Sequence, residues 1–219
     1  MTPAAPVELA GARRVAYRTL AACFLEPSPA RLATLRTAVP ELRERARPLS
    51  ELAPGPAWEA LLRALEGLEE AAAERVAEEH ATLFLAGVRG GACPPHASAY
   101  LIRTGYEGAG VVAAVAAAYR GAGYLVEGSE LPDHLAVELD FLGELCRREA
   151  EGGPAAEGWR ERELSFLRGH LLRWLPRFVE RLARVSPAGF YRWPAEAALA
   201  LAGHDEVLLS SLGAGKGVA

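Results

Sequence analysis

Residues 130–150, ELPDHLAVELDFLGELCRREA, carry the clearest helical signal in the chain. Leucines at 131, 135, 139, 142 and 145 recur at three- and four-residue steps, which is the spacing of one face of an α-helix. Pro132 suits the first turn because its φ is fixed, and Asp133 complements the positive end of the helix dipole. The stretch predicts a helix over about 131–150, with a buried leucine face and with Asp133 and His134 near its exposed N-terminal end.

The same spacing of apolar positions recurs along almost the whole chain, whereas alternating runs of β-branched residues are nearly absent. The expected fold class is therefore all-α, a single-domain helical bundle. An N-terminal helix is expected to end before Pro27, because the residue before a proline disfavours the helical conformation. Further helices are expected at about 29–38, 41–47, 56–72, 74–85, 108–122, 157–184 and 188–203.

Glycine and proline interrupt the chain mainly at one place. Residues 87–95, GVRGGACPP, combine three glycines with two prolines. We therefore expect a loop over 87–97 between two helical groups. One all-helical domain is predicted over residues 1–212, followed by a flexible tail over 213–219.

Composition narrows the classes of protein that remain. Hydrophobic residues make up 51% of the chain and charged residues 24%, which excludes a disordered chain. The formal charge of −4 gives no overall basic field for nucleic acid phosphates. The three cysteines lack a CxxC pattern, so neither a disulfide framework nor a cysteine-rich zinc site is expected. With no apolar run near the ~20 residues that span a bilayer, we expect a cytoplasmic protein without stable membrane insertion.

Enzyme motifs are present only as fragments. Residues 108–113, GAGVVA, fit the dinucleotide pattern GxGxxG/A, and Glu127 follows at the distance of a ribose-binding acid, but residues 101–107 do not read as the strand that this motif needs. Cys93 and His96 form a CxxH, and His134 and Glu138 stand one helical turn apart. Each pair supplies only two of the four ligands of a tetrahedral metal ion. For His134 and Glu138, an interaction between side chains one turn apart on the helix surface is the better explanation. No catalytic residue, metal or cofactor is predicted, and a nucleotide- or metal-dependent enzyme remains the alternative.

Two stretches together carry a resemblance to a known family. The first reads E-x-x-x-L-F from Glu79, continues through the glycine-rich loop and resumes as P-P-x-x-S-x-Y from Pro94. The second reads E-L-P-D-H-L-x-V-E-L-x-F from Glu130. Their combination resembles the TorD/DmsD/NarJ family of molybdoenzyme maturation chaperones, and the similarity extends over about residues 8–205.

The resemblance implies a function without catalysis. Members of this family are all-helical cytoplasmic chaperones that bind the twin-arginine leader of a molybdopterin-containing catalytic subunit until its cofactor is inserted. The implied partner is thus the precursor of a molybdopterin oxidoreductase catalytic subunit. An acidic helical groove would offer apolar walls to the hydrophobic region of the leader and carboxylates to its arginines. A monomer and a dimer that swaps helices across the 87–95 loop are both compatible with the sequence, as is a helical adaptor for an unrelated protein.

The resemblance also implies which residues bind the peptide. The loop side of the groove would consist of Pro94, Pro95, Ser98 and Tyr100, and its polar end of Asp133 and His134, with Glu138 in the same set. Asp133 is expected to contact an arginine or an amide of the leader. His96 stands where many members have an aromatic residue, often Trp, and His80 where Tyr is frequent.

Overall fold

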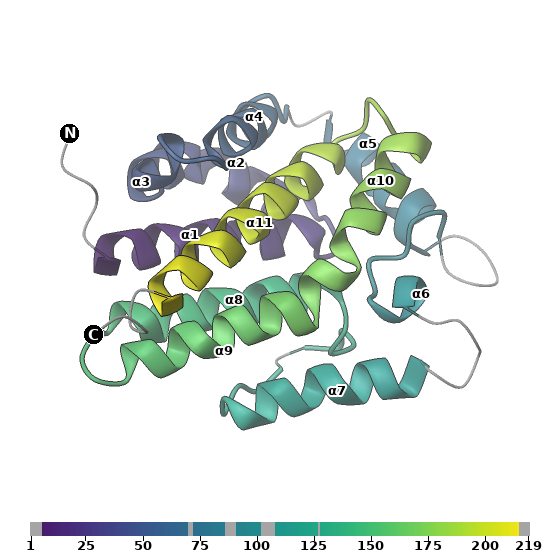
Figure 1. Cartoon of the computed structure of the whole chain (residues 1–219). Helices are drawn as coiled ribbons and strands as arrows, with labels where there is room; N and C mark the ends of the chain where they lie inside the picture. Colours follow the sequence, from purple (N-terminus) through teal and green to yellow (C-terminus); the bar gives the residue numbers. More distant parts are fainter. Residues whose placement is uncertain (1–5, 70–71, 86–90, 102–107, 127, 215–219) are drawn as a thin grey trace.

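The computed structural model describes residues 6–69, 72–85, 91–101, 108–126 and 128–214, and the regular elements in these ranges are helical (Figure 1). The α-helices are α1 (Pro6–Phe24), α2 (Pro29–Arg45), α3 (Arg47–Ser50), α4 (Gly55–Glu66), α5 (Ala72–His80), α6 (Ser98–Leu101), α7 (Gly108–Gly121), α8 (Leu135–Ala150), α9 (Ala156–Gly169), α10 (Leu175–Val185) and α11 (Arg192–Ala214). A π-helical turn, Ala81–Leu85, continues α5, and a 3₁₀ turn, Leu171–Arg173, precedes α10. The all-α prediction is confirmed.

Four long helices form the centre of the bundle. Helix α1 packs along α8, α9 packs beside α8, and α11 crosses α9 and reaches α4 (Figure 1). The predicted leucine face of α8 is confirmed, since Leu135, Leu139, Leu142 and Leu145 are buried, although Leu131 lies before the helix and is 54% exposed. One hydrophobic core results, because buried residues from α1, α8, α9 and α11 belong to a single cluster.

Aromatic rings connect elements that are distant in the sequence. Phe84 in the π-helical turn packs against Tyr191 near the start of α11, with ring centroids 4.7 Å apart. Phe24, at the end of α1, packs edge-on against Phe178 of α10 at 5.9 Å. Such tilted and edge-to-face pairs add to the burial of large apolar surfaces. They fix the C-terminal end of α1 and the end of the π-helical turn, which border the candidate site described below.

A buried cluster of charges joins the four central helices. Arg13 on α1 is 1% exposed and is surrounded by three carboxylates. Its Nη1 lies 2.7 Å from Glu149 Oε2, its Nε lies 2.8 Å from Asp205 Oδ2, and its Nη2 donates to Glu163. Tyr17, one turn after Arg13, donates a further hydrogen bond of 2.9 Å to Asp205. One guanidinium therefore cross-links α1 to α8, α9 and α11.

Several helix boundaries differ from those predicted. The first helix ends before Pro27 as expected. The helices expected at 29–38 and 41–47 are instead one helix, α2, which contains Pro40. Leu35 and Val39 are both buried on its inner face, and this packing compensates for the hydrogen bond that proline cannot donate.

The C-terminal half also differs. The helix expected over 157–184 is divided into α9 and α10 by the 3₁₀ turn, where His170 and Trp174 have non-helical backbone angles and Trp174 is fully buried. Helix α8 begins at Leu135 rather than at 131, and α11 runs to Ala214, beyond the expected end at 203. The predicted flexible tail therefore begins inside a helix, and residues 215–219 lie outside the described ranges.

Glu79, the first residue of the E-x-x-x-L-F motif, fastens the turn before α11. Its carboxylate accepts hydrogen bonds from Ser186 Oγ at 2.7 Å and from the backbone N–H of Phe190 at 2.8 Å. A Cβ on Gly189 would clash with Glu79 Oε1. Gly189→Ala is expected to displace this carboxylate and to lower the free energy of unfolding by about 1–3 kcal/mol, measured by urea denaturation.

Gly203→Ala is the matched control for this substitution. Gly203 lies within α11, and nothing lies within 4 Å of an added Cβ. Because alanine is the better helix former, this variant should be up to about 1 kcal/mol more stable than the wild type. Equal stability of the two variants would contradict the role assigned to Glu79.

Candidate functional site

The two stretches that carry the family resemblance meet in space. The backbone N–H of Ala97 donates to the carbonyl of Asp133 at 3.0 Å, and the N–H of Leu135 donates to the carbonyl of Pro95 at 2.8 Å. Between these bonds, His96 and His134 form an isolated antiparallel bridge. The segment after the glycine-rich loop is therefore docked onto the N-terminal end of α8.

The buried side chain of Asp133 holds these two segments together. Its side chain is 0% exposed, and its Oδ2 accepts a hydrogen bond of 2.9 Å from the backbone N–H of Ser98. Its Oδ1 lies 3.6 Å from His96 Nδ1. Burial alone would raise the pKa of Asp133, but the contacts with His96 and Ser98 outweigh burial and lower it. The expected exposed position beside the helix terminus is wrong, because the hydrogen bond to Ser98 turns the carboxylate inward.

His134 caps helix α8, whereas Pro132 and Asp133 lie before the cap. It is the N-cap residue of α8, and its Nδ1 accepts a hydrogen bond of 3.1 Å from the backbone N–H of Ala136. The side chain is 5% exposed. Burial, with His96 nearby, lowers the pKa of His134 to about 3, so the ring is neutral at pH 7.

Glu138 lies one turn deeper than His134, and it is fully buried rather than part of a surface pair. Its Oε2 accepts a hydrogen bond of 3.3 Å from the indole N–H of Trp174. Burial raises the pKa of Glu138 well above its ordinary value. The ring of Tyr100 stacks on that of Trp174, with centroids 5.5 Å apart, so Glu138 and Tyr100 both pack around the same tryptophan.

A cavity of about 150 Å³ opens in front of this junction. It lies between the end of α1, the end of the π-helical turn and the approach to α8. Its lining comprises Phe24, Glu26, His80, Phe84, Leu85, Pro95, His96, Glu130 and His134. We refer to this space as the histidine cavity.

Two carboxylates give the histidine cavity an acidic character. Burial lowers the pKa of His80, and His134 is neutral, as described above. The carboxylate of Glu130 lies 3.8 Å from the Nε2 of that neutral ring, and Glu26 contributes the second carboxylate. A cavity lined by two carboxylates, three imidazoles and apolar side chains suits a flat cation with an apolar stem, such as an arginine side chain.

The residues predicted for peptide binding separate into two groups. Pro95 and His134 line the histidine cavity. The others are in the layer that supports it: Pro94, Ser98, Tyr100, Asp133 and Glu138. Glu26 and the rings of Phe24 and Phe84 were not predicted, and their place at the cavity follows from tertiary packing. Peptide binding at these positions stays a prediction.

The fragments of enzyme motifs do not form a second site in the described residues. The GAGVVA stretch opens helix α7, while residues 102–107 and Glu127 lie outside the described ranges. Cys93 Sγ contacts the Tyr100 hydroxyl at 3.4 Å, on the inner side of the loop. Across the described ranges, no group of three or more His, Cys, Asp and Glu side chains is arranged to hold a metal ion. Within the same ranges, no helix combines the length and apolar character needed to cross a membrane.

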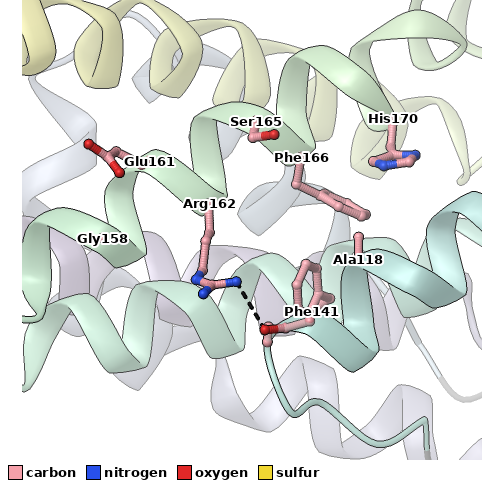
Figure 2. A pocket seen from close by; sticks show the side chains of 10 residues that line it. Ala118, Phe141, Gly158, Glu161, Arg162, Ser165, Phe166 and His170 are labelled. Carbon is pink, nitrogen blue, oxygen red and sulfur yellow. Dashed lines mark hydrogen bonds between the residues drawn. The ribbon is translucent and has the colours of Figure 1, made fainter.

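A separate cavity of about 390 Å³ lies between α7, α8 and α9, and Phe141, the last residue of the second motif, contributes to its lining (Figure 2). Phe141 and Phe166 pack against each other on one side of it, with ring centroids 4.8 Å apart. Arg162 reaches across from α9 and donates a hydrogen bond of 3.0 Å to the carbonyl of Gly121 (Figure 2). This contact joins the end of α7 to α9.

Part of the chain is similar in sequence to named chaperones. A TorD chaperone of Aeromonas salmonicida is 44% identical over 61 residues, which cover 27% of this chain and 28% of that protein. A selenate reductase assembly chaperone of Thauera selenatis is 44% identical over 62 residues, which cover 27% of this chain and 32% of that protein. The chain thus spans about a third of the length of these relatives.

The fold has a solved counterpart. The crystal structure of an Archaeoglobus fulgidus protein described as a redox enzyme maturation protein matches with a TM-score of 0.52. The match covers 90% of this chain and 93% of that one at 19% identity, and it supports the fold alone. The match to a family model covers more of this chain than the matches to the two relatives do. It extends over residues 32–180. The chain therefore belongs to the nitrate reductase delta subunit family.

Proposed function

We propose that this protein is a cytoplasmic maturation chaperone that binds the N-terminal, twin-arginine leader of a molybdopterin-containing reductase subunit. It would hold the subunit for cofactor insertion before export, and it would act by binding rather than by catalysis. The observation that carries the proposal is the acidic histidine cavity at the junction of the two motifs. The names of the relatives, TorD and reductase assembly chaperones, support the same function.

One arginine of the leader would enter the histidine cavity. Its guanidinium would lie between the carboxylates of Glu26 and Glu130, which can accept paired, charge-assisted hydrogen bonds. The imidazole rings, neutral at His80 and His134, would flank the planar group without repelling it. Asp133 would contribute indirectly, because it holds Ser98 and thereby the loop that brings Pro95 and His96 to the cavity.

Neutralising the two carboxylates tests this function. Glu26→Gln and Glu130→Gln should each weaken binding of a synthetic twin-arginine leader peptide about five- to tenfold, because each removes one charged partner. Isothermal titration calorimetry measures the affinity. A peptide with both arginines replaced by glutamine should bind weakly and should not distinguish the variants from the wild type.

Glu161→Gln provides a matched control, since Glu161 is an exposed glutamate on α9 and does not line the histidine cavity. Mass spectrometry of proteins that co-purify with the tagged chain should in parallel recover a molybdopterin-enzyme precursor. Failure of the wild type to bind leader peptides, together with recovery of unrelated partners only, would favour a helical adaptor. Tight binding of a nucleotide or metal instead would favour the enzyme alternative.

A further inference from the structure

Helix α10 presents a row of arginines to solvent. Arg177, Arg181 and Arg184 are all exposed, and the side chain of Arg184 is 70% exposed. Because they stand four and seven residues apart, they lie within about 60° of one another around the helix axis. The helical rise separates the first from the last by about 10 Å. We refer to these three side chains as the arginine face.

The opposite side of α10 is fixed in the hydrophobic core. Leu175, Phe178 and Leu182 are buried, and the helix packs beside α11 at one side of the bundle (Figure 1). The helix is therefore held with its arginine face outward. Its apolar side is already covered, so a ligand of this surface has to be recognised through the guanidinium groups.

Two of the three arginines have no carboxylate partner within the described part of the chain. Arg184 lies 3.4 Å from Glu180, but no such pair forms there at Arg177 or Arg181. The one pair is largely exposed at both ends and contributes little to stability. By contrast, both arginines of α8 are paired with Glu144. The arginine face thus leaves guanidinium donors available to an external acid.

Arg177 joins the arginine face to the loop of the candidate site. Its Nη1 donates a hydrogen bond of 3.1 Å to the carbonyl of Tyr100, near the end of α6. The same stretch of chain brings Pro95 and His96 to the histidine cavity, whose lining includes no residue of α10. The arginine face is therefore a second surface beside the candidate site and not a part of it.

The charge of this region contrasts with that of the whole chain. Residues 171–185 contain four arginines and one glutamate, a net charge of +3, in a chain whose formal charge is −4. A broad anionic surface, such as a bilayer or a nucleic acid duplex, would also meet the negative remainder of the protein and be repelled by it. A narrow acidic segment could contact the arginine face alone, so charge complementarity favours a peptide as its occupant.

We propose that the arginine face of α10 binds an acidic segment of a partner protein. Each guanidinium would donate paired hydrogen bonds to the carboxylate of an aspartate or glutamate. Alternate residues of an extended peptide lie about 6.6 Å apart on one side, close to the helical rise of about 6 Å between Arg177 and Arg181. Acidic residues at alternate positions would thus meet successive arginines. This interaction goes beyond the proposed function, because it uses neither the twin-arginine leader nor the histidine cavity.

The experiment uses two synthetic peptides of five Ser-Glu repeats, one of them with every glutamate replaced by glutamine. The full-length wild type and the double variant Arg181→Gln/Arg184→Gln are titrated with each at low ionic strength. Arg177 is kept, because it holds the Tyr100 carbonyl. The control is Arg63→Gln/Arg120→Gln, which removes the same charge from exposed positions in the last turns of α4 and α7.

The wild type is expected to bind the glutamate peptide and not the glutamine peptide. Arg181→Gln/Arg184→Gln should weaken this binding at least tenfold and make it less dependent on salt, because two charged partners are lost. The control variant should change it less than twofold. Titration with the twin-arginine leader peptide should give the same affinity for all three proteins, which shows that the fold and the histidine cavity are intact.

Three results would overturn the inference. Equal weakening in the two double variants would mean that net charge, and not the arginine face, governs binding. Failure of the wild type to bind the glutamate peptide would remove the acidic segment as its ligand. Binding to phosphatidylglycerol vesicles that depends on Arg181 and Arg184, without binding of the peptide, would assign the face to lipid headgroups instead. None of these results bears on the proposed function, which the leader peptide tests separately.

Discussion

Arg13→Met is expected to lower the free energy of unfolding by about 3–5 kcal/mol, the largest effect on stability that we predict for a single side chain. The substitution fills much of the same volume but leaves Glu149, Glu163 and Asp205 buried together without their shared cation. Removing one member of a buried ionic cluster costs the desolvation of the charges that remain. Urea denaturation followed by circular dichroism measures the loss.

Arg160→Met is the control for this prediction. Arg160 pairs with the same Glu149 at 2.8 Å but is 29% exposed, so its loss should cost less than about 1 kcal/mol. Similar losses for Arg13→Met and Arg160→Met would contradict the assignment of Arg13 as the central cross-link.

The pH dependence of the same cluster gives an independent check. Burial raises the pKa of Glu163 to about 8 even though Arg13 opposes the shift. The folded protein therefore keeps a proton that the unfolded chain loses near pH 4.3, so this group makes the folded state less stable as pH rises from about 4.5 to 8. Glu163→Gln should remove that slope, which is at most about 1.4 kcal/mol per pH unit, and urea denaturation at a series of pH values with Arg13 intact measures it.

Local patterns predicted the helices better than they predicted the junctions between them. The leucine spacing from 135 to 145 identified the buried face of α8, because a helical repeat follows from backbone geometry alone. The expected exposed position of Asp133 was wrong, since a backbone N–H 35 residues earlier in the chain, at Ser98, donates to that carboxylate and the side chain is buried. Such a contact depends on how the 91–101 segment packs against the start of α8. Rules that use only neighbouring residues cannot predict this packing.

Tertiary packing also explains why Arg13 of the buried charge cluster and Glu26 of the candidate site were not predicted. Arg13 has a charged side chain that is buried, and three later helices each supply a carboxylate to it. Glu26 stands in the short connection after α1, where the sequence shows an end of a helix and nothing more. The resemblance identified the segments that meet at the site, whereas the cavity lining required their arrangement in space.

Asp133→Ala is expected to weaken leader binding by more than tenfold and to lower the free energy of unfolding by about 1–3 kcal/mol. The substitution leaves the N–H of Ser98 without its acceptor and removes the carboxylate beside His96. The loop would then hold Pro95 and His96 less firmly at the histidine cavity. Titration with the leader peptide measures the first effect, and thermal denaturation the second.

Asp133→Asn separates this positioning role from direct contact with an arginine. Asparagine keeps an oxygen that can accept from Ser98 but lacks the negative charge, so the variant should retain most of its affinity and its stability. Hydrogen exchange of the Ser98 amide should be fast in Asp133→Ala and slow in Asp133→Asn, because it reports the bond itself. If Asp133→Asn instead loses leader binding while the Ser98 amide stays protected, then the charge acts on the ligand, and Asp133 reaches the arginine through a rearranged loop.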